Sequence, residues 1–397
     1  MTTGVTRPLA VYWLLPAAIF LFILPFAHSI TLRWFSALLT VAVAARHWSH
    51  GASIPPLPCK AAIGFWVATL LWSLLWAADP AASFSELKVD VIYSLLMFAA
   101  FYALTQGERE LEVCLSALAA GSAVISLLAI GYFASYGKWV PGYQNALGEF
   151  ATCMITALPA IMLLALRNMP WSGRAIWVRV ALPVMLLAGL LTLSRMFLAA
   201  LLLMMLTGAA LRARRRKLET RQIFLIIAGI VGAAAAAGVM LMAQRRGLRF
   251  ADDLRPAIWE VAWHRIAEHP WTGTGYGRLL DGEIYQRAFP GASIWHPHNL
   301  LLCFAEQAGV FAALAVILLF IALGREYWRL YQSPTRLTSY VGIAGLVMLL
   351  GVLTKNMTDM FFVRECALMF WSVNGILLGY GRRAEQWAAA QGRGANA

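Results

Sequence analysis

Residues 111–133 read LEVCLSALAAGSAVISLLAIGYF, a run of 23 residues with one charged side chain, Glu112. A helix of this length crosses the roughly 30 Å hydrocarbon core of a bilayer, because each residue adds about 1.5 Å. The whole chain has the same character: 61% of its 397 residues are hydrophobic, 13% are charged, and the mean hydropathy is +0.69. Soluble domains carry about 25% charged residues. The composition predicts an all-α integral membrane protein, folded as one polytopic membrane domain over residues 1–397.

Apolar runs of roughly 16–25 residues recur along the chain, separated by short polar stretches. They predict a bundle of about twelve membrane-spanning helices, the first of which is an uncleaved span rather than a signal peptide. The predicted spans are residues 8–26, 30–45, 61–77, 89–104, 111–133, 150–166, 176–193, 196–211, 223–243, 299–323, 339–357 and 367–380.

The formal net charge of +13 is explained by topology rather than by nucleic-acid binding. Most basic residues lie between the apolar runs, and cytoplasmic loops of membrane proteins are enriched in Lys and Arg. Alternation of the spans from a cytoplasmic N-terminus places the basic clusters 212–221, 325–336 and 382–383 on the cytoplasmic side. We therefore expect a multi-pass protein of the lipid bilayer with both termini in the cytoplasm and no nucleic-acid partner.

One outer segment departs from this pattern, because residues 244–298 are long and contain seven arginines. A loop of this length is more often functional than a simple connection between helices. Long segments also cross the membrane largely regardless of their charge, so the arginines do not contradict an outer location. Within it, residues 256–269 have the spacing of an amphipathic helix at the membrane surface, and residues 273–277, GTGYG, form a turn-rich loop. We predict a periplasmic loop over 244–298 that carries part of an active site.

Two arginines near the outer face are candidates for binding phosphate. Arg195 lies between two apolar runs, and Arg265 lies on the predicted surface helix. Either could be an interfacial anchor, because long basic side chains extend toward water from helix ends. Either could instead bind phosphate oxygens, since the guanidinium group donates two parallel hydrogen bonds and keeps its charge.

A His-Pro-His-Asn element enters the predicted tenth span. His298 stands at the start of this helix, where the helix dipole favours a neutral imidazole that can act as a base. His296 competes for that role, and Asn299 is a plausible N-cap. Glu306 follows on the same face, inside the membrane. Asp359 and Arg364 flank the last outer loop and are either site residues or a simple salt bridge.

Two arginines beside a base suit one reaction. They can hold a lipid-linked pyrophosphate while an acceptor hydroxyl attacks the sugar attached to it. The pair Asp252-Asp253 has a poor spacing for chelating a metal ion, so arginines are expected to replace the metal, and no cofactor is expected. Substrate-binding candidates are His296, Asn299, Arg278, Arg287 and Asp359.

The motifs resemble those of the O-antigen ligase superfamily, which includes O-antigen ligases, O-antigen polymerases and protein O-oligosaccharyltransferases. The likeness covers about residues 145–380, and its most specific part is the His-Asn element after a long outer loop. Where the family often has Gly-x-x-Gly, this chain has Gly309-Val310-Phe311-Ala312. The matching residues are Asn145-x-x-Gly148, Leu193-Ser194-Arg195, Glu268-x-Pro270-x-x-Gly273-x-Gly275-x-Gly277, His298-Asn299-x-x-Leu302 and Phe370-Trp371-x-x-x-Gly375.

The resemblance implies an inverting glycosyltransferase with a GT-C-like helical bundle and a periplasmic active site in the bacterial inner membrane. By motif position, His298 matches the family's base, and Arg195 and Arg265 match its essential arginines. Its donor is O-antigen linked to undecaprenyl diphosphate. The compact chain with one large outer loop and no soluble C-terminal domain favours the ligase of lipopolysaccharide biosynthesis, whose acceptor is lipid A-core.

Three alternatives stay open. The polymerase and the protein O-oligosaccharyltransferase share the same catalytic logic as the ligase. A secondary transporter would place ionisable residues near the bilayer midplane, often with internal repeats, whereas the Arg and His residues here gather at one interface.

Overall fold

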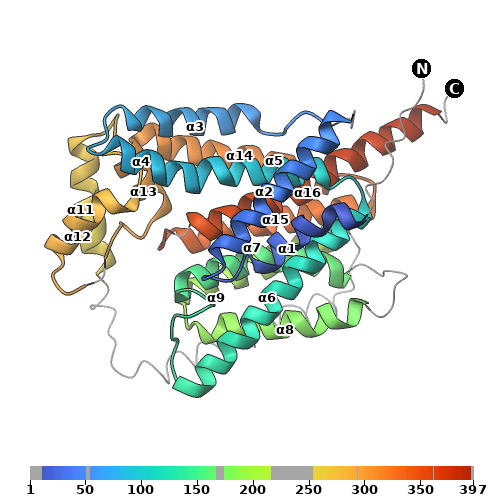
Figure 1. The fold of residues 1–397 in the computed structure, drawn as a ribbon, viewed down its shortest axis with the longest axis horizontal. Helices are drawn as coiled ribbons and strands as arrows, with labels where there is room; N and C mark the ends of the chain where they lie inside the picture. Colours follow the sequence, from blue (N-terminus) through green and yellow to red (C-terminus); the bar gives the residue numbers. More distant parts are fainter. Residues whose placement is uncertain are drawn as a thin grey trace.

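The computed structural model describes residues 11–50, 54–166, 174–215, 254–292, 294–360 and 362–394, and all regular structure within these residues is helical (Figure 1). The predicted all-helical class is therefore confirmed for the described chain. The elements are η1 (Val11–Leu14), α1 (Leu15–Ile23), α2 (Ile30–Ser49), α3 (Lys60–Leu74), α4 (Pro80–Leu87), η2 (Lys88–Ile92), α5 (Tyr93–Leu104), α6 (Glu108–Tyr136), α7 (Leu147–Leu166), α8 (Arg174–Leu191), α9 (Arg195–Arg215), α11 (Arg255–Glu268), α12 (Arg278–Ala288), α13 (Leu300–Ala308), α14 (Val310–Tyr331), α15 (Arg336–Asn356) and α16 (Arg364–Gly394).

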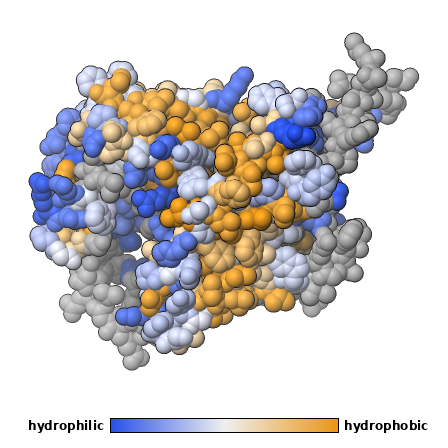
Figure 2. Space-filling view, viewed as in Figure 1, coloured by the Kyte–Doolittle hydropathy of each residue, from blue (hydrophilic) through white to orange (hydrophobic). Residues whose placement is uncertain are grey.

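Six helices of the described chain are long and apolar enough to cross a membrane. Three shorter apolar helices accompany them. Hydrophobic residues dominate the long side of the bundle, while hydrophilic residues gather at the end where α11 and α12 lie (Figure 2). These helices indicate a multi-pass membrane protein. The number of twelve spans stays a prediction. The expected span 223–243 lies outside the described residues.

Close packing of α16 against α5 forms the centre of the bundle (Figure 1). A Cβ atom on Gly375 would lie 2.5 Å from the Phe98 carbonyl oxygen, so only glycine permits this approach. The Trp371 ring meets the Phe98 ring edge-on at 5.4 Å and stacks on Trp66 at 5.8 Å. Small residues that let backbones approach are the usual means of packing helices in a membrane. This contact sets the position of α16 against α5.

The expected tenth span, residues 299–323, is wrong as a single helix. The chain breaks at Gly309, which has a φ of +80°, and divides the segment into α13 and α14. The Val310 amide donates to the Pro270 carbonyl oxygen at 2.8 Å, and a Cβ on Gly309 would lie 2.5 Å from the Trp271 carbonyl oxygen. The break therefore exists because the backbone at Pro270 and Trp271 packs against the junction of the two helices.

The described part of the segment expected to be an outer loop, from residue 254 onward, is more helical than expected. Helix α11 confirms the helix expected at 256–269, and its buried residues Ile258, Ala262 and Ile266 follow helical spacing. Helix α12 was not predicted. The glycine segment is a loop, as expected, and the Thr274 and Gly275 amides each donate at 3.0 Å to carbonyl oxygens at the end of α13.

This pairing satisfies carbonyl groups that a helix end otherwise leaves without partners. Helices α11, α12 and α13 lie together at one end of the bundle, opposite the end toward which α16 runs (Figure 1).

Candidate active site

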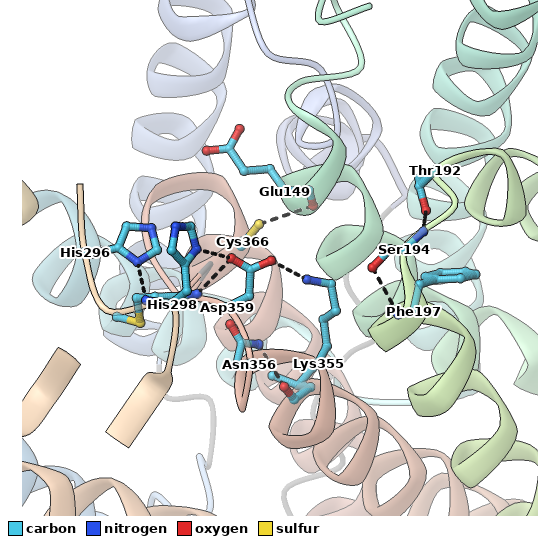
Figure 3. A network of polar contacts seen from close by, with 12 residues as sticks. Glu149, Thr192, Ser194, Phe197, His296, His298, Lys355, Asn356, Asp359 and Cys366 are labelled. Atoms are coloured by element: carbon cyan, nitrogen blue, oxygen red, sulfur yellow. Dashed lines mark hydrogen bonds and ion pairs between the residues drawn. The ribbon is translucent and has the colours of Figure 1, made fainter. Parts of the chain in front are cut away.

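Three side chains form a connected chain at the end of the bundle near α13 (Figure 3). His298 Nδ1 lies 3.2 Å from Asp359 Oδ1, and Lys355 Nζ donates to Asp359 Oδ2 at 2.7 Å. Lys355 is in the last turn of α15 and is 1% exposed, whereas the His298 side chain is 28% exposed. The imidazole of His298 is thus the accessible end of this row of three side chains, and the carboxylate and the ammonium group lie deeper in the protein.

The carboxyl group of Asp359 is held ionised. Its burial acts to raise its pKa, but the hydrogen bond with His298 and the charge and hydrogen bond of Lys355 outweigh that effect, so the pKa lies below its ordinary value. An ionised carboxylate only accepts hydrogen bonds. The proton between Asp359 and His298 must therefore be carried by Nδ1, which leaves the Nε2 of a neutral His298 with a lone pair.

His296 has the opposite arrangement. Its Nδ1 accepts the backbone N–H of His298 at 3.1 Å, so in a neutral ring the proton must be on Nε2. The two rings are 4.2 Å apart, and His296 is 5% exposed. The local fold thus gives these neighbouring histidines different tautomers and different access.

Asn299 fixes the position of His298. Its side-chain oxygen accepts from the Leu301 and Leu302 amides at 3.0 and 3.1 Å, which confirms the expected N-cap, now of α13. Its amide nitrogen donates to the Met357 carbonyl oxygen at 2.9 Å.

Neighbouring contacts hold the same segment. Trp259 of α11 donates to the Pro297 carbonyl oxygen at 3.0 Å. His298 has a φ of +51°, a left-handed backbone conformation uncommon for residues other than glycine. Helix α11, the loop after α15 and the cap of α13 together hold the histidine in this conformation.

Arg265 lies beside a buried carboxylate. Its Nε pairs with Oε1 of Glu306, a side chain of α13 with no exposed surface, while Tyr285 of α12 donates to the other carboxylate oxygen at 2.9 Å. Arg265 is 13% exposed. Part of its charge is therefore balanced within the protein, and Glu306 orients the guanidinium group.

Arg195 begins α9 and is exposed. Its position follows from the packing of α9 on α15, in which Met204 faces Gly351 and Gly208 faces Val347. Four residues forward along α9, from Met204 to Gly208, correspond to four residues backward along α15, from Gly351 to Val347, so the two helices pack antiparallel. Continued to the start of α9, this register brings Arg195 level with the loop after α15, which contains Asp359. Figure 3 shows Ser194, the preceding residue, across from Lys355.

The side chain of Arg287 is not drawn into this cluster. Arg287 is exposed and pairs with Glu283 on its own helix at 2.9 Å, and Arg278 begins α12. The alternative of a salt bridge between Asp359 and Arg364 is wrong. Asp359 instead binds His298 and Lys355, because the loop turns its carboxylate toward α15.

Arg364 has other partners. Its side chain lies 3.9 Å from Glu86 Oε1, and its backbone N–H donates to Asp90 Oδ1 at 2.8 Å. Asp252 and Asp253, together with Arg245, Arg246 and Arg249, lie outside the described residues.

Lys355 and Tyr285 are the site residues that the sequence argument missed. Lys355 had a usable signal, because a lysine near the end of an apolar span is expensive unless it is paired. Tyr285 had none, since its helix was not predicted. Among the described residues, no three His, Cys, Asp or Glu side chains are grouped closely enough to hold a metal ion.

These features define a multi-pass helical membrane protein with a polar site at one end of its bundle. The family described as O-Antigen ligase has a model that matches residues 180–317, a segment that contains Arg195, Arg265 and His298. The match supports assignment of the chain to the O-antigen ligase family, whose members are glycosyltransferase-like enzymes that use lipid-linked polysaccharides in a membrane. A search of curated proteins finds no match.

Proposed function

We propose that this protein is the O-antigen ligase of lipopolysaccharide biosynthesis. It transfers O-antigen polysaccharide from undecaprenyl diphosphate to lipid A-core, with inversion and without a metal ion. The observation that carries the proposal is the His298–Asp359–Lys355 chain. These contacts supply an accessible base at one end of the helical bundle. The segment that matches the O-Antigen ligase model, residues 180–317, contains both candidate arginines.

In this reaction His298 is the base. The acceptor hydroxyl donates its proton to Nε2 while its oxygen attacks the anomeric carbon of the donor. The bond between that carbon and the phosphate oxygen breaks, its electron pair stays on the oxygen, and undecaprenyl diphosphate leaves. One displacement inverts the anomeric configuration. The tautomer enforced by Asp359 supports this assignment, and the bond from the His298 backbone to His296 argues against His296.

The arginines stabilise the departing diphosphate. A general base accounts for roughly 10²–10⁴-fold of the rate, and preorganised cations supply stabilisation as charge develops on the leaving oxygens. Arg195, exposed and level with the Asp359 loop, is one ligand for phosphate. Arg265 is the second, with Glu306 and Tyr285 setting the direction of its guanidinium group.

Asp359 positions the base rather than binding substrate. Its carboxylate is occupied by His298 and Lys355, so it fixes the tautomer of the base. Asn299 likewise acts through its backbone contacts rather than on substrate. Arg278 and Arg287, on the outer loop, are the proposed contacts for phosphates of the acceptor. We further propose that the enzyme acts in the bacterial inner membrane, with cytoplasmic termini and a periplasmic site.

A strain that lacks the gene tests the proposal. It should make lipopolysaccharide that ends at the core, while long glycan chains accumulate on undecaprenyl diphosphate. A core that carries a single repeat unit would identify a polymerase instead. Unchanged lipopolysaccharide with loss of glycan from proteins would identify a protein O-oligosaccharyltransferase. Uptake of a solute by vesicles without covalent product would indicate a transporter.

A further inference from the structure

A groove opens at the end of the bundle opposite the candidate active site. It has a volume of about 890 Å³ and lies between the start of α3, the second half of α14 and the second half of α16. Helix α14 begins next to α13 and runs away from it, so the groove is separated from His298 by most of the length of α14. The proposed transfer reaction makes no use of this space.

The rim of the groove is positively charged. Lys60 and Arg325 are exposed, and neither forms an ion pair with another described residue. The single carboxylate in the lining, Glu385, accepts two hydrogen bonds from Arg329, at 3.0 and 2.7 Å. Because Arg329 already neutralises Glu385, the groove presents a net positive charge to a ligand.

The wall of the groove is apolar and faces outward. Phe65 of α3 and Leu318 and Ile321 of α14 line it with 39%, 41% and 45% of their surfaces exposed. Both helices are apolar, and α14 is long enough to span a membrane. Hydrocarbon chains can therefore lie along these side chains while a polar group stays at the basic rim.

We propose that the groove binds an anionic glycerophospholipid. Its phosphate lies between Lys60 and Arg325, beside the first backbone N–H groups of α3, and its acyl chains cover Phe65, Leu318 and Ile321. Basic pockets between membrane helices are suited to anionic lipid headgroups. Two cations without an apolar wall would bind free phosphate, and an apolar wall without cations would bind any lipid. The two together therefore favour an anionic phospholipid. The lipid anchors the start of α3 to the second half of α14, away from the active site.

Native mass spectrometry of the full chain in detergent tests this assignment. The protein is mixed with equal amounts of dioleoyl phosphatidylglycerol and dioleoyl phosphatidylcholine. We expect one phosphatidylglycerol molecule to be retained in about tenfold preference. The double substitution Lys60→Gln/Arg325→Gln should weaken its retention about tenfold. Ala322→Phe, which keeps every charge and fills the groove, should weaken it by a similar factor.

The matched control removes two other basic residues. Arg109 and Arg336 are exposed, lie in the first turns of α6 and α15 at the same end of the bundle, and do not line the groove. Arg109→Gln/Arg336→Gln should change retention less than twofold, with gel filtration and thermal melting confirming that each variant is folded. Equal retention of the two lipids overturns the proposal, as does an equal loss in the control. Displacement of the lipid by millimolar inorganic phosphate indicates a phosphate site and also overturns it.

Discussion

Replacing Asp359 with asparagine tests whether the proposed base depends on its tautomer. The substitution keeps the shape of the side chain but exchanges one carboxylate oxygen for an NH₂ donor. Asp359 accepts from His298 on one side and from the Lys355 ammonium group on the other. An asparagine here has one oxygen, which can accept a hydrogen bond from only one of these two partners. We expect it to face Lys355, because a buried ammonium group without an acceptor costs more free energy than an imidazole without one.

The expected magnitude follows from that geometry. With its oxygen toward Lys355, the introduced asparagine directs its NH₂ group at His298 Nδ1, which forces the imidazole proton onto Nε2. The base is then absent, so kcat should fall by roughly the 10²–10⁴-fold that a general base contributes. Binding of the donor should be nearly unchanged, because the arginines are untouched. The effect is therefore expected in kcat rather than in KM.

The assay is steady-state transfer by purified protein over a range of donor concentrations, with Asp79→Asn as the control. Asp79 is a carboxylate that caps α4 by accepting from the Ala81 and Ala82 amides. Asparagine caps a helix equally well, so this control should keep full activity. An Asp359→Asn protein that is folded and within tenfold of the wild-type kcat would refute the reasoning.

Stability provides a second readout of the same carboxylate. Because the pKa of Asp359 is lowered in the folded protein, its charge stabilises the fold above its unfolded value of about 3.9. That contribution is lost as the pH falls through the folded value. Above about pH 5 the melting temperature of the wild type should exceed that of Asp359→Asn, and the margin should shrink below about pH 4.

Three further predictions concern the other site residues. His298→Asn should abolish transfer; asparagine is chosen because it tolerates the left-handed backbone at this position. His296→Ala should keep substantial activity. The reverse order of activities in a transfer assay would assign the base to His296. Arg265→Gln should cost about 3–5 kcal/mol of stability by leaving the Glu306 carboxylate buried without its partner. Arg265→Gln/Glu306→Gln should recover the melting temperature but not transfer, and recovery of both would make the pair purely structural. Arg195→Ala should severely reduce transfer and Arg195→Lys should restore only part of it, since lysine lacks the bidentate fork; full restoration in the assay would exclude bidentate binding.

The sequence predicted those parts of the fold that composition and periodicity control. The apolar run 111–133 appears within α6, and the helix expected at 256–269 is α11. The break at Gly309 was missed because residues 299–323 are apolar on both sides of it. Only the approach of the backbone at Pro270 shows why the helix must stop there.

The candidate site shows the same division between local and long-range information. The cap formed by Asn299 could be predicted, since it depends on the next three residues. The partners of His298 and Arg265 could not. Asp359 lies 61 positions from His298, and Glu306 lies 41 positions from Arg265. These pairs depend on how α11, α13 and α15 pack, which the pattern of one chain does not reveal.

The most direct test of the proposed function is a reaction with the purified full chain, undecaprenyl-diphosphate-linked glycan and lipid A-core in excess EDTA. We predict a joined product whose new glycosidic linkage has the anomeric configuration opposite to that in the donor, as determined by NMR. A linkage of retained configuration would contradict the single displacement with His298 as base. Loss of product in EDTA with rescue by added Mg²⁺ or Mn²⁺ would contradict charge neutralisation by Arg195 and Arg265.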